Sequence, residues 1–167
     1  AAYYALSEDN QAFWNNAGVG NQMRANHTPM RRLIMDSIRF YVEEMHVDGF
    51  RFDLAAVLGE VDGDHNRWDD PKNTVLQDLI DDPVFQERNI RFIAEPWAAG
   101  GSYGSCVGAY PLSTSKEGFG WGEWNPHFRD WWRSIVNMDE WKLNSNEGPV
   151  DGGTSLTGSS PLYSYNE

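Results

Sequence analysis

The sequence predicts an α/β fold made of about three strand-helix units. Three short strand-like segments, at residues 47–54, 90–95 and 120–124, alternate with stretches whose apolar residues recur at helical spacing. Such alternation is typical of parallel strands that are connected and covered by helices.

A loop and a helix precede the first strand. Residues 1–23 have no sustained hydrophobic period and are rich in Asn and Gly, which indicates a loop. The next apolar residues recur on one helical face until about residues 44–46, with Thr28 as the expected cap and Pro29 at the first helical position.

Residues 47–54 change to a period of two, which indicates a strand. The alternation assigns Arg51 and Asp53 to one face and Phe50 and Phe52 to the other. The phenylalanine face is the one that covering helices would bury.

The second unit begins with a polar loop at residues 59–70 and a helical pattern at residues 71–80. A β-rich segment at residues 90–95 follows and ends in Glu95. The chain between Asp53 and Glu95 is long enough for a crossover between two parallel strands.

The third unit follows a long Gly/Ser-rich connection at residues 96–120, interpreted as a loop. A strand at residues 120–124 should lead into a helix with Asn125 as its cap and Pro126 at its first position. The apolar residues expected to be buried by this helix are Phe128, Trp131, Trp132, Ile135 and Val136. Residues 142–167 have no period and are interpreted as a loop.

Three strand-helix units cannot close a sheet on itself, whereas eight can form a (β/α)8 TIM barrel with its site at the carboxyl ends of the strands. We therefore interpret residues 1–167 as the middle segment of one barrel domain, a partial (β/α)8 barrel. The missing barrel segments are expected from the same polypeptide.

Composition and charge exclude several kinds of partner. A net charge of −12 and 13 scattered basic residues would repel a phosphate backbone, so we expect no nucleic acid partner. No window approaches the roughly 18 apolar residues of a membrane span, and no leader is evident, so we expect a soluble protein and no membrane. The single cysteine, Cys106, leaves the compartment open, with the cytoplasm slightly favoured over secretion.

Aromatic residues make up 14% of the chain, and several of the eight tryptophans lie beside Gly, Glu or Asn. Flat rings next to carboxylates and amides suit a carbohydrate cleft, because sugars present both C–H faces and hydroxyl groups. The alternative is that most of these rings fill a core.

Asp53 and Glu95 each lie at the end of a predicted strand, so they should leave the sheet at the same edge. Two such carboxyl groups are the minimum needed to break a glycosidic bond, and a retaining mechanism needs them roughly 5–5.5 Å apart. Neighbouring parallel strands, about 4.7–4.9 Å apart, can supply this separation.

The surroundings of the two acids suggest different roles. Arg51 faces the same way as Asp53 and should keep it ionised, as a nucleophile requires. Glu95 lies among apolar neighbours that would raise its pKa and hold the proton of a general acid. A simple ion pair and a solvated loop carboxylate remain the alternatives on spacing alone.

The motifs VDGFRFDLA, FIAEPW and GWGEWNPHFRD, taken together, resemble the isoamylase and glycogen-debranching branch of the α-amylase superfamily of glycoside hydrolases. The Asn-rich string NNAGVGN and the stretch DSIRFYVEEMHVDGFRFDLA are similar to the same family. The resemblance covers roughly residues 3–133. It implies a catalytic (β/α)8 barrel and cleavage of α-1,6 branch points in glycogen, amylopectin or related α-glucans.

The resemblance also implies roles for individual residues. Asp53 would be the nucleophile, Glu95 the general acid and base, and Arg51 the arginine next to the nucleophile. Trp97 and Trp124 would bind substrate by stacking on sugar rings, although Trp124 could instead pack under its own helix.

The sequence departs from related amylases in two ways, one bearing on the bond that is cleaved and the other on whether these residues suffice for activity. Enzymes that cut α-1,4 bonds usually carry a Lys-His pair shortly after the nucleophile, whereas residues 54–58 here read Leu-Ala-Ala-Val-Leu, which favours debranching. The family also needs a His and Asn on an earlier strand and a third carboxylate on a later one, and neither segment is recognisable here. We therefore expect the 167 residues alone to be inactive.

No metal or cofactor is expected within the chain. The histidines lack metal-ligand spacing, and His46 is interpreted as a residue at the end of a helix. The acidic residues between 62 and 70 lack the 12-residue pattern of a calcium loop and indicate a solvated loop. Calcium elsewhere in a longer chain stays open.

Other functions remain possible on the sequence alone. A pullulanase or an α-1,4-acting relative would share both carboxylates, and a non-catalytic glucan-binding or regulatory subunit would share the fold. A barrel remnant with a purely structural use is a further alternative.

Overall fold

A computed structural model describes residues 2–61, 64–68, 73–97 and 121–138. Its main sheet has three parallel strands in the order β1-β4-β5, with β1 at Gly49–Phe52, β4 at Arg91–Ala94 and β5 at Trp121–Glu123. The expected α/β class is therefore confirmed. The expected closure into a barrel goes beyond these three strands and stays a proposal.

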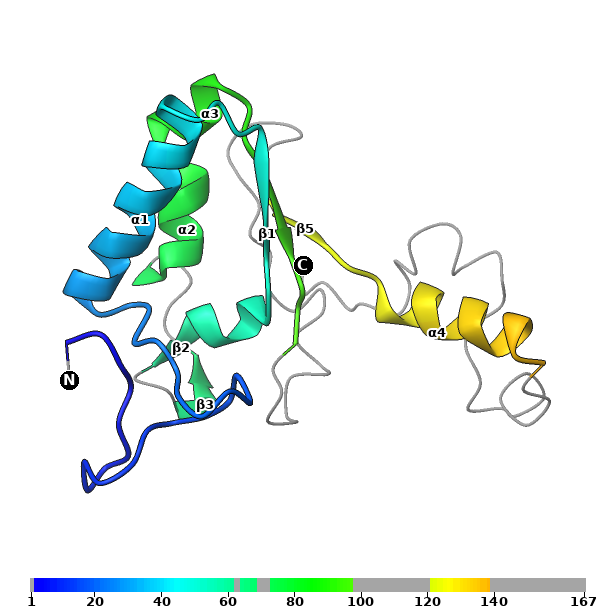
Figure 1. The fold of residues 1–167 in the computed structure, drawn as a ribbon, viewed down its shortest axis with the longest axis horizontal. Coiled ribbons are helices and arrows are strands. Elements are labelled where there is room, and N and C mark those ends of the chain that lie inside the picture. Colours follow the sequence, from blue (N-terminus) through cyan, green and yellow to red (C-terminus); the bar gives the residue numbers. More distant parts are fainter. Residues whose placement is uncertain (1, 62–63, 69–72, 98–120, 139–167) are drawn as a thin grey trace.

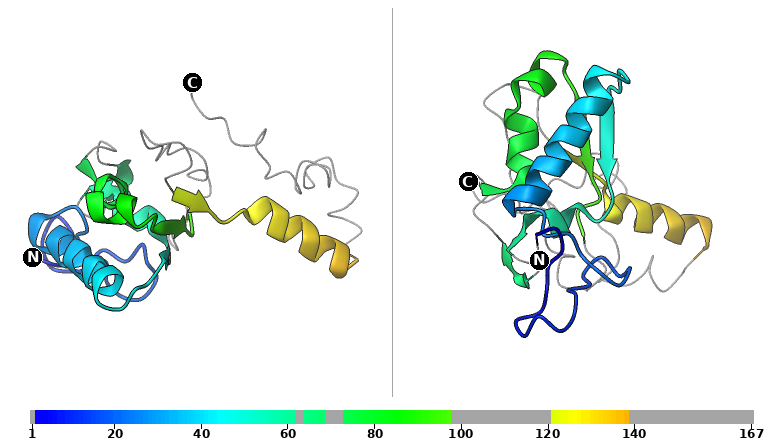
Figure 2. Two further views of the ribbon diagram at one scale, coloured as in Figure 1. Left: turned by 90° about the horizontal axis from the view of Figure 1, so that it is seen from above. Right: turned by 60° about the vertical axis from the view of Figure 1, so that its left-hand side comes forward.

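Helices lie on one side of this sheet. Helix α1 (Thr28–Glu43) and helix α2 (Val75–Asp81) lie side by side, with the short α3 (Pro83–Glu87) beyond them (Figure 1). Helix α4 (Pro126–Val136) extends away on the opposite side, as both views of Figure 2 also show.

The chain between β1 and α2 forms a 3-10 helix, η1 (Ala55–Gly59), and a two-stranded antiparallel hairpin, β2 (Glu60–Val61) with β3 (Asp64–Trp68). This hairpin and α3 were not expected from the sequence. Strand β3 is mostly polar and α3 has only five residues, so neither gives a hydrophobic period long enough to recognise.

Strand register gives the sheet two unlike faces. Phe50 is opposite Phe92, which is opposite Trp121, and this row faces the helices. The next row places Arg51 opposite Ile93 on the other face, where Ile93 is 40% exposed. The predicted alternation in β1 is thus confirmed, with the phenylalanines inward.

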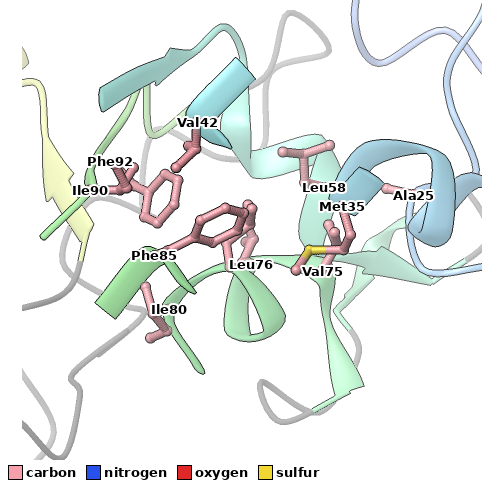
Figure 3. Packing of buried hydrophobic residues seen from close by; sticks show 11 residues of the cluster. Ala25, Met35, Val42, Leu58, Val75, Leu76, Ile80, Phe85, Ile90 and Phe92 are labelled. Atoms are coloured by element: carbon pink, nitrogen blue, oxygen red, sulfur yellow. The ribbon is translucent and has the colours of Figure 1, made fainter. Parts of the chain in front are cut away.

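The hydrophobic core fills the space between the sheet and the helices (Figure 3). Phe92 of β4 and Phe85 of α3 are both fully buried and meet edge to face, with ring centroids 5.7 Å apart. Such pairs add to the free energy gained by burying the rings. The other members of the cluster are Ala25, Met35, Val42, Leu58, Val75, Leu76, Leu79, Ile80 and Ile90.

Two arginines of α1 form ion pairs with acidic residues of α2 and of the cap of α3. Arg31 Nη2 lies 2.6 Å from Asp78 Oδ1, and Arg39 Nη2 lies 2.5 Å from Asp82 Oδ2. The Asp82 side chain is 1% exposed and also accepts the Val84 N–H at 2.9 Å, which caps α3. The buried Asp82 carboxylate thus binds α1 through Arg39 and also caps α3. Its loss should destabilise the packing of α1 and the start of α3.

The N-terminal loop is tied to the region that follows β1 by a buried polar cluster. Glu60 is 2% exposed, and its carboxylate accepts hydrogen bonds from Asn16, at 3.0 Å, and from Gln22. Asn26 donates to the Glu60 carbonyl at 3.2 Å and accepts the Val75 N–H at 3.0 Å. The loop predicted at residues 1–23 is confirmed for the described residues, and buried amide groups hold it in place.

Three details of the sequence prediction are wrong. The cap of α1 is His27, because the Arg31 N–H already bonds to the His27 carbonyl at 2.9 Å, and Thr28 lies inside the first turn. Strand β1 is shorter than residues 47–54, since the backbone turns at Leu54 with φ 45°.

The third error concerns α4, whose apolar residues were expected to be buried. Phe128, Trp132, Ile135 and Val136 are between 38% and 64% exposed, Trp131 is half-buried, and Ser134 is buried instead. The expected cap is confirmed, because the Asn125 side chain accepts the Phe128 N–H at 3.0 Å.

Several expectations fall outside the described residues, namely those for the connection at residues 98–120, for Cys106 and for the tail at residues 139–167. Within the described ranges, every helix is too short or too polar to traverse a bilayer.

We predict that Asp82→Ala destabilises the protein by on the order of 3 kcal/mol, because it removes the α3 cap and leaves Arg39 without its buried partner. Asp36→Ala is the matched control, because Asp36 pairs with the same arginine but is 74% exposed and lies at the longer distance of 3.8 Å. It should change stability by less than about 0.5 kcal/mol. Urea unfolding followed by circular dichroism measures both, and equal shifts would contradict the prediction.

Candidate functional site

The register of β1 and β4 brings the two predicted acids to one edge. Phe52 is opposite Ala94, so Asp53 and Glu95 are the next residues beyond the carboxyl ends of neighbouring strands. The pairing continues through the Glu95 N–H, which donates to the Phe52 carbonyl at 3.0 Å. Both carboxyl groups therefore emerge from fixed backbone.

Arg51 contacts both acids at once. Its Nη1 lies 2.6 Å from Asp53 Oδ1, and its Nη2 lies 3.1 Å from Glu95 Oε2. A planar guanidinium suits this task because its donors point in fixed directions. The cation thereby sets the orientation of one carboxyl group relative to the other.

The surroundings of Asp53 favour its charged form. The Glu95 side chain, and then the Arg51 guanidinium, lower the pKa of Asp53 below its ordinary value of 3.8. The Asp53 side chain is 74% exposed, whereas that of Glu95 is 13% exposed. Asp53 is thus an accessible carboxylate that stays charged at neutral pH.

The turn after Asp53 holds Glu95 in place. Leu54 has left-handed backbone angles, φ 45° and ψ 46°, and its N–H donates to Glu95 Oε2 at 2.9 Å. The Ala55 N–H then donates to the Glu95 carbonyl at 2.9 Å. The purely apolar setting expected for Glu95 is wrong, because its carboxyl group meets Arg51 and this backbone donor.

Of the two predicted tryptophans, Trp124 lies beside Arg51 and Trp97 lies beside Trp124. The Arg51 Cζ is 4.1 Å from the ring centroid of Trp124, and the rings of Trp124 and Trp97 are 6.5 Å apart at 55°. Trp124 is 46% exposed, which argues against the alternative that it packs under its own helix. All five predicted site residues are therefore linked by direct contacts.

Arg129 was not identified from the sequence. It lies in the first turn of α4, with its Cζ 5.3 Å from the ring centroid of Trp97. The available signal was its place in the motif GWGEWNPHFRD, four residues after the helix cap. The backbone N–H of Leu54 was also missed, because no side-chain pattern reveals a left-handed turn there.

The segment directly after Asp53 offers no polar side chain. Ala55, Ala56, Val57 and Leu58 are all at most 7% exposed and form η1 against the core. Residues 54–58 therefore serve packing and backbone geometry, and substrate contacts must come from elsewhere.

Metal ligands do not gather in the part of the chain that the structure describes, where no three His, Cys, Asp or Glu side chains form a group suited to a metal. His46 is exposed just beyond α1 with φ 57°, in agreement with its interpretation as a helix-end residue. The side chains of the acidic stretch at residues 62–70 lie outside the description.

No family model matches the chain, but it is similar to named proteins over almost its full length. It is 36% identical to an isoamylase of Flavobacterium sp. over 97% of the chain, and 40% identical to a glycogen operon protein GlgX homolog of Mycobacterium tuberculosis over 97%. It is also 37% identical over 99% to the chloroplastic isoamylase 3 of Oryza sativa subsp. japonica. Over this segment the chain therefore resembles isoamylases and GlgX proteins. It spans 19–20% of the length of these three relatives.

Solved structures support the fold of this chain. A pullulanase from Bacillus acidopullulyticus matches 77% of the chain and 14% of its own, with a TM-score of 0.53 and 24% identity. A maltotriose-bound pullulanase from Anoxybacillus sp. LM18-11 matches 77% of the chain and 16% of its own, with a TM-score of 0.55 and 23% identity. At this identity the likeness concerns the fold.

We predict that Arg51→Met raises the pKa of Asp53, because the guanidinium is one of the groups that lower it. Titration of the aspartate side-chain carbons by NMR, in the protein that carries this segment, measures the shift. Asp9 is the matched control: hydrogen bonds from Ser7 and Gln11 lower its pKa, and Arg51 is not among the causes. Asp9 should titrate unchanged, and an unchanged Asp53 would contradict the prediction.

Proposed function

We propose that this chain forms the middle part of the catalytic barrel of a retaining glycoside hydrolase that cleaves α-1,6 branch points of glycogen, amylopectin or related α-glucans. The main support for the proposal is the contact of Arg51 with both carboxyl groups, at the ends of two neighbouring parallel strands. Similarity to isoamylases and GlgX supports the choice of reaction and substrate.

The spacing of the acids favours a retaining course. An inverting enzyme keeps its carboxyl groups roughly 6.5–9.5 Å apart to leave room for a water molecule, whereas a retaining enzyme holds them closer. One guanidinium bridges Asp53 and Glu95, with Arg51 Nη1 2.6 Å from Asp53 Oδ1 and Nη2 3.1 Å from Glu95 Oε2, and this supports the closer spacing.

In the proposed first step, Glu95 gives its proton to the glycosidic oxygen while Asp53 attacks the anomeric carbon, and the bond between that carbon and the oxygen breaks. In the second step, Glu95 takes a proton from water, whose oxygen displaces Asp53 from the anomeric carbon. Arg51 would keep Asp53 charged before the attack, in line with the lowered pKa of Asp53.

The proposed specificity for branch points is supported by what lies beyond the nucleophile. Residues 55–58 are buried apolar side chains, so this stretch has no equivalent of the Lys-His pair of α-1,4-acting relatives. Sugar rings would instead meet the flat faces of Trp97 and Trp124, which are linked to the acids through Arg51.

We further propose that additional barrel strands of the same polypeptide complete the site. The sheet face that carries Arg51 and Ile93 is not covered by α1, α2 or α3, and the chain spans about a fifth of its relatives, 19–20%. A third carboxylate that stabilises the transition state would have to come from such a segment, so the 167 residues alone should be inactive.

Replacing either acid in the complete protein should abolish turnover and leave glucan binding measurable. Asp53→Asn and Glu95→Gln keep the shape of each side chain but remove the nucleophile or the acid, and we expect kcat to fall by about 10³-fold or more. Asp48→Asn is the matched control, because Asp48 is exposed at the opposite end of the strand β1 and should have normal turnover. Substantial turnover by either active-site variant would contradict the assignment.

Adding azide to the Asp53→Ala and Glu95→Ala variants should distinguish the nucleophile from the general acid and base. Without Glu95, azide should attack the glycosyl–Asp53 ester and give a glycosyl azide with retained configuration. Without Asp53, azide should attack the substrate directly and give the inverted product. The opposite pairing of variant and product would exchange the two roles.

The products distinguish debranching from related reactions. The complete protein should release linear chains from glycogen and amylopectin by α-1,6 cleavage, detected by iodine staining and chain-length analysis, while residues 1–167 alone should release none. Preferential cleavage of pullulan would instead indicate a pullulanase, and α-1,4 products an amylase-like enzyme. Glucan binding without any hydrolysis would indicate a non-catalytic subunit.

A further inference from the structure

Arg129 occupies a defined position beside the proposed sugar-binding ring. Its Cζ lies 5.3 Å from the ring centroid of Trp97, within the range of a cation–aromatic contact. Asp130 orients the guanidinium through two hydrogen bonds, from Nε at 2.8 Å and from Nη2 at 3.2 Å. The guanidinium thus bonds to its neighbour in the chain and also lies over the Trp97 ring.

Four side chains form a continuous row along the edge of the site: Arg51, Trp124, Trp97 and Arg129. Arg51 lies 4.1 Å from the Trp124 ring, the two indoles are 6.5 Å apart, and Arg129 lies 5.3 Å from the Trp97 ring. Each indole thus has a guanidinium over one face. A sugar that stacks on Trp97 must use the face that Arg129 leaves open.

The charge of Arg129 also reaches the proposed acid. Hydrogen bonding to Asp130 raises the pKa of Arg129, and the negative charges of Asp130 and Glu95 add to this effect. Arg129 therefore remains a cation at any working pH and is electrostatically linked to Glu95, although no direct bond joins them.

We propose that Arg129 is a positioning residue that fixes the plane of the Trp97 indole and covers one of its faces, so that an α-glucan ring is received on the other. This inference rests on the proposed function. It assigns the start of α4 to substrate binding, whereas the acids that break the bond come from β1 and β4.

The first test compares Arg129→Met and Arg129→Lys in the complete protein. Methionine keeps the length of the side chain without the charge, so KM for amylopectin should rise about threefold to tenfold, as expected when a cation–aromatic contact is lost, while kcat changes by less than about twofold. Lysine keeps the charge and should recover part of the loss. Arg133→Met, at an exposed position one turn further along α4, is the matched control.

The second test asks whether Arg129 acts through Trp97. Maltohexaose affinity is measured by calorimetry in the Glu95→Gln background, for Arg129→Met, Trp97→Ala and the double variant. If Arg129 acts by positioning the ring, its replacement should weaken binding about threefold to tenfold when Trp97 is present and have almost no effect when the ring is absent. Equal losses in both backgrounds would overturn the inference, as would a fall in kcat with KM unchanged.

The outcomes separate this inference from the proposed function. Failure of the unmodified protein to debranch, with a normal Arg129 effect on maltohexaose binding, would refute only the catalytic proposal. Normal debranching with binding that is insensitive to Arg129 would refute only the positioning role. Absence of any glucan binding would refute both.

Discussion

The parallel pairing of β1 with β4 is the constraint on which the site depends. Because Phe52 is opposite Ala94, the residues that follow are forced to the same edge, and their side chains alternate to the same side of the sheet. A shift of register by one residue would send the acids to different faces. The core row of Phe50, Phe92 and Trp121 resists such a shift, since it would expose these rings.

The two acids share one positively charged partner, Arg51. Arg51 is held between two carboxyl groups and also lies over Trp124, so its position is determined from three directions. Each acid has a second anchor: Asp53 follows directly from β1, and Glu95 is bound by the Leu54 N–H. For the proposed reaction, a site ordered in this way would need little rearrangement, and such preorganisation lowers the cost of reaching a transition state.

Sequence patterns predicted those parts of the fold that depend on local periodicity. Alternation located β1 and the direction of Arg51 and Asp53, and Asn125 followed by Pro126 located the start of α4. These succeed because strand alternation and helix capping are short-range effects. The contacts among the five predicted site residues follow from the same strand ends.

The remaining features depend on contacts that no single segment encodes. The hairpin β2–β3 is specified partly by the buried Glu60 and its amide partners in a distant loop. The left-handed turn at Leu54 and the contact of Arg129 with Trp97 arise only once the strands are aligned. The exposed apolar face of α4 shows the converse: an amphipathic pattern identifies a helix but not the partner that would cover it.

The open sheet has a practical consequence for handling this segment. In the described part of the chain, β1 and β5 each have one edge that pairs with no described strand, and the face carrying Ile93 lacks a helical cover. Unsatisfied backbone donors and acceptors along a strand are a template for adding another strand, including one from a second copy. In the proposed barrel further strands would cover these edges, so we expect the segment expressed by itself to self-associate through them, and co-expression with the remaining segments of the proposed barrel to prevent this.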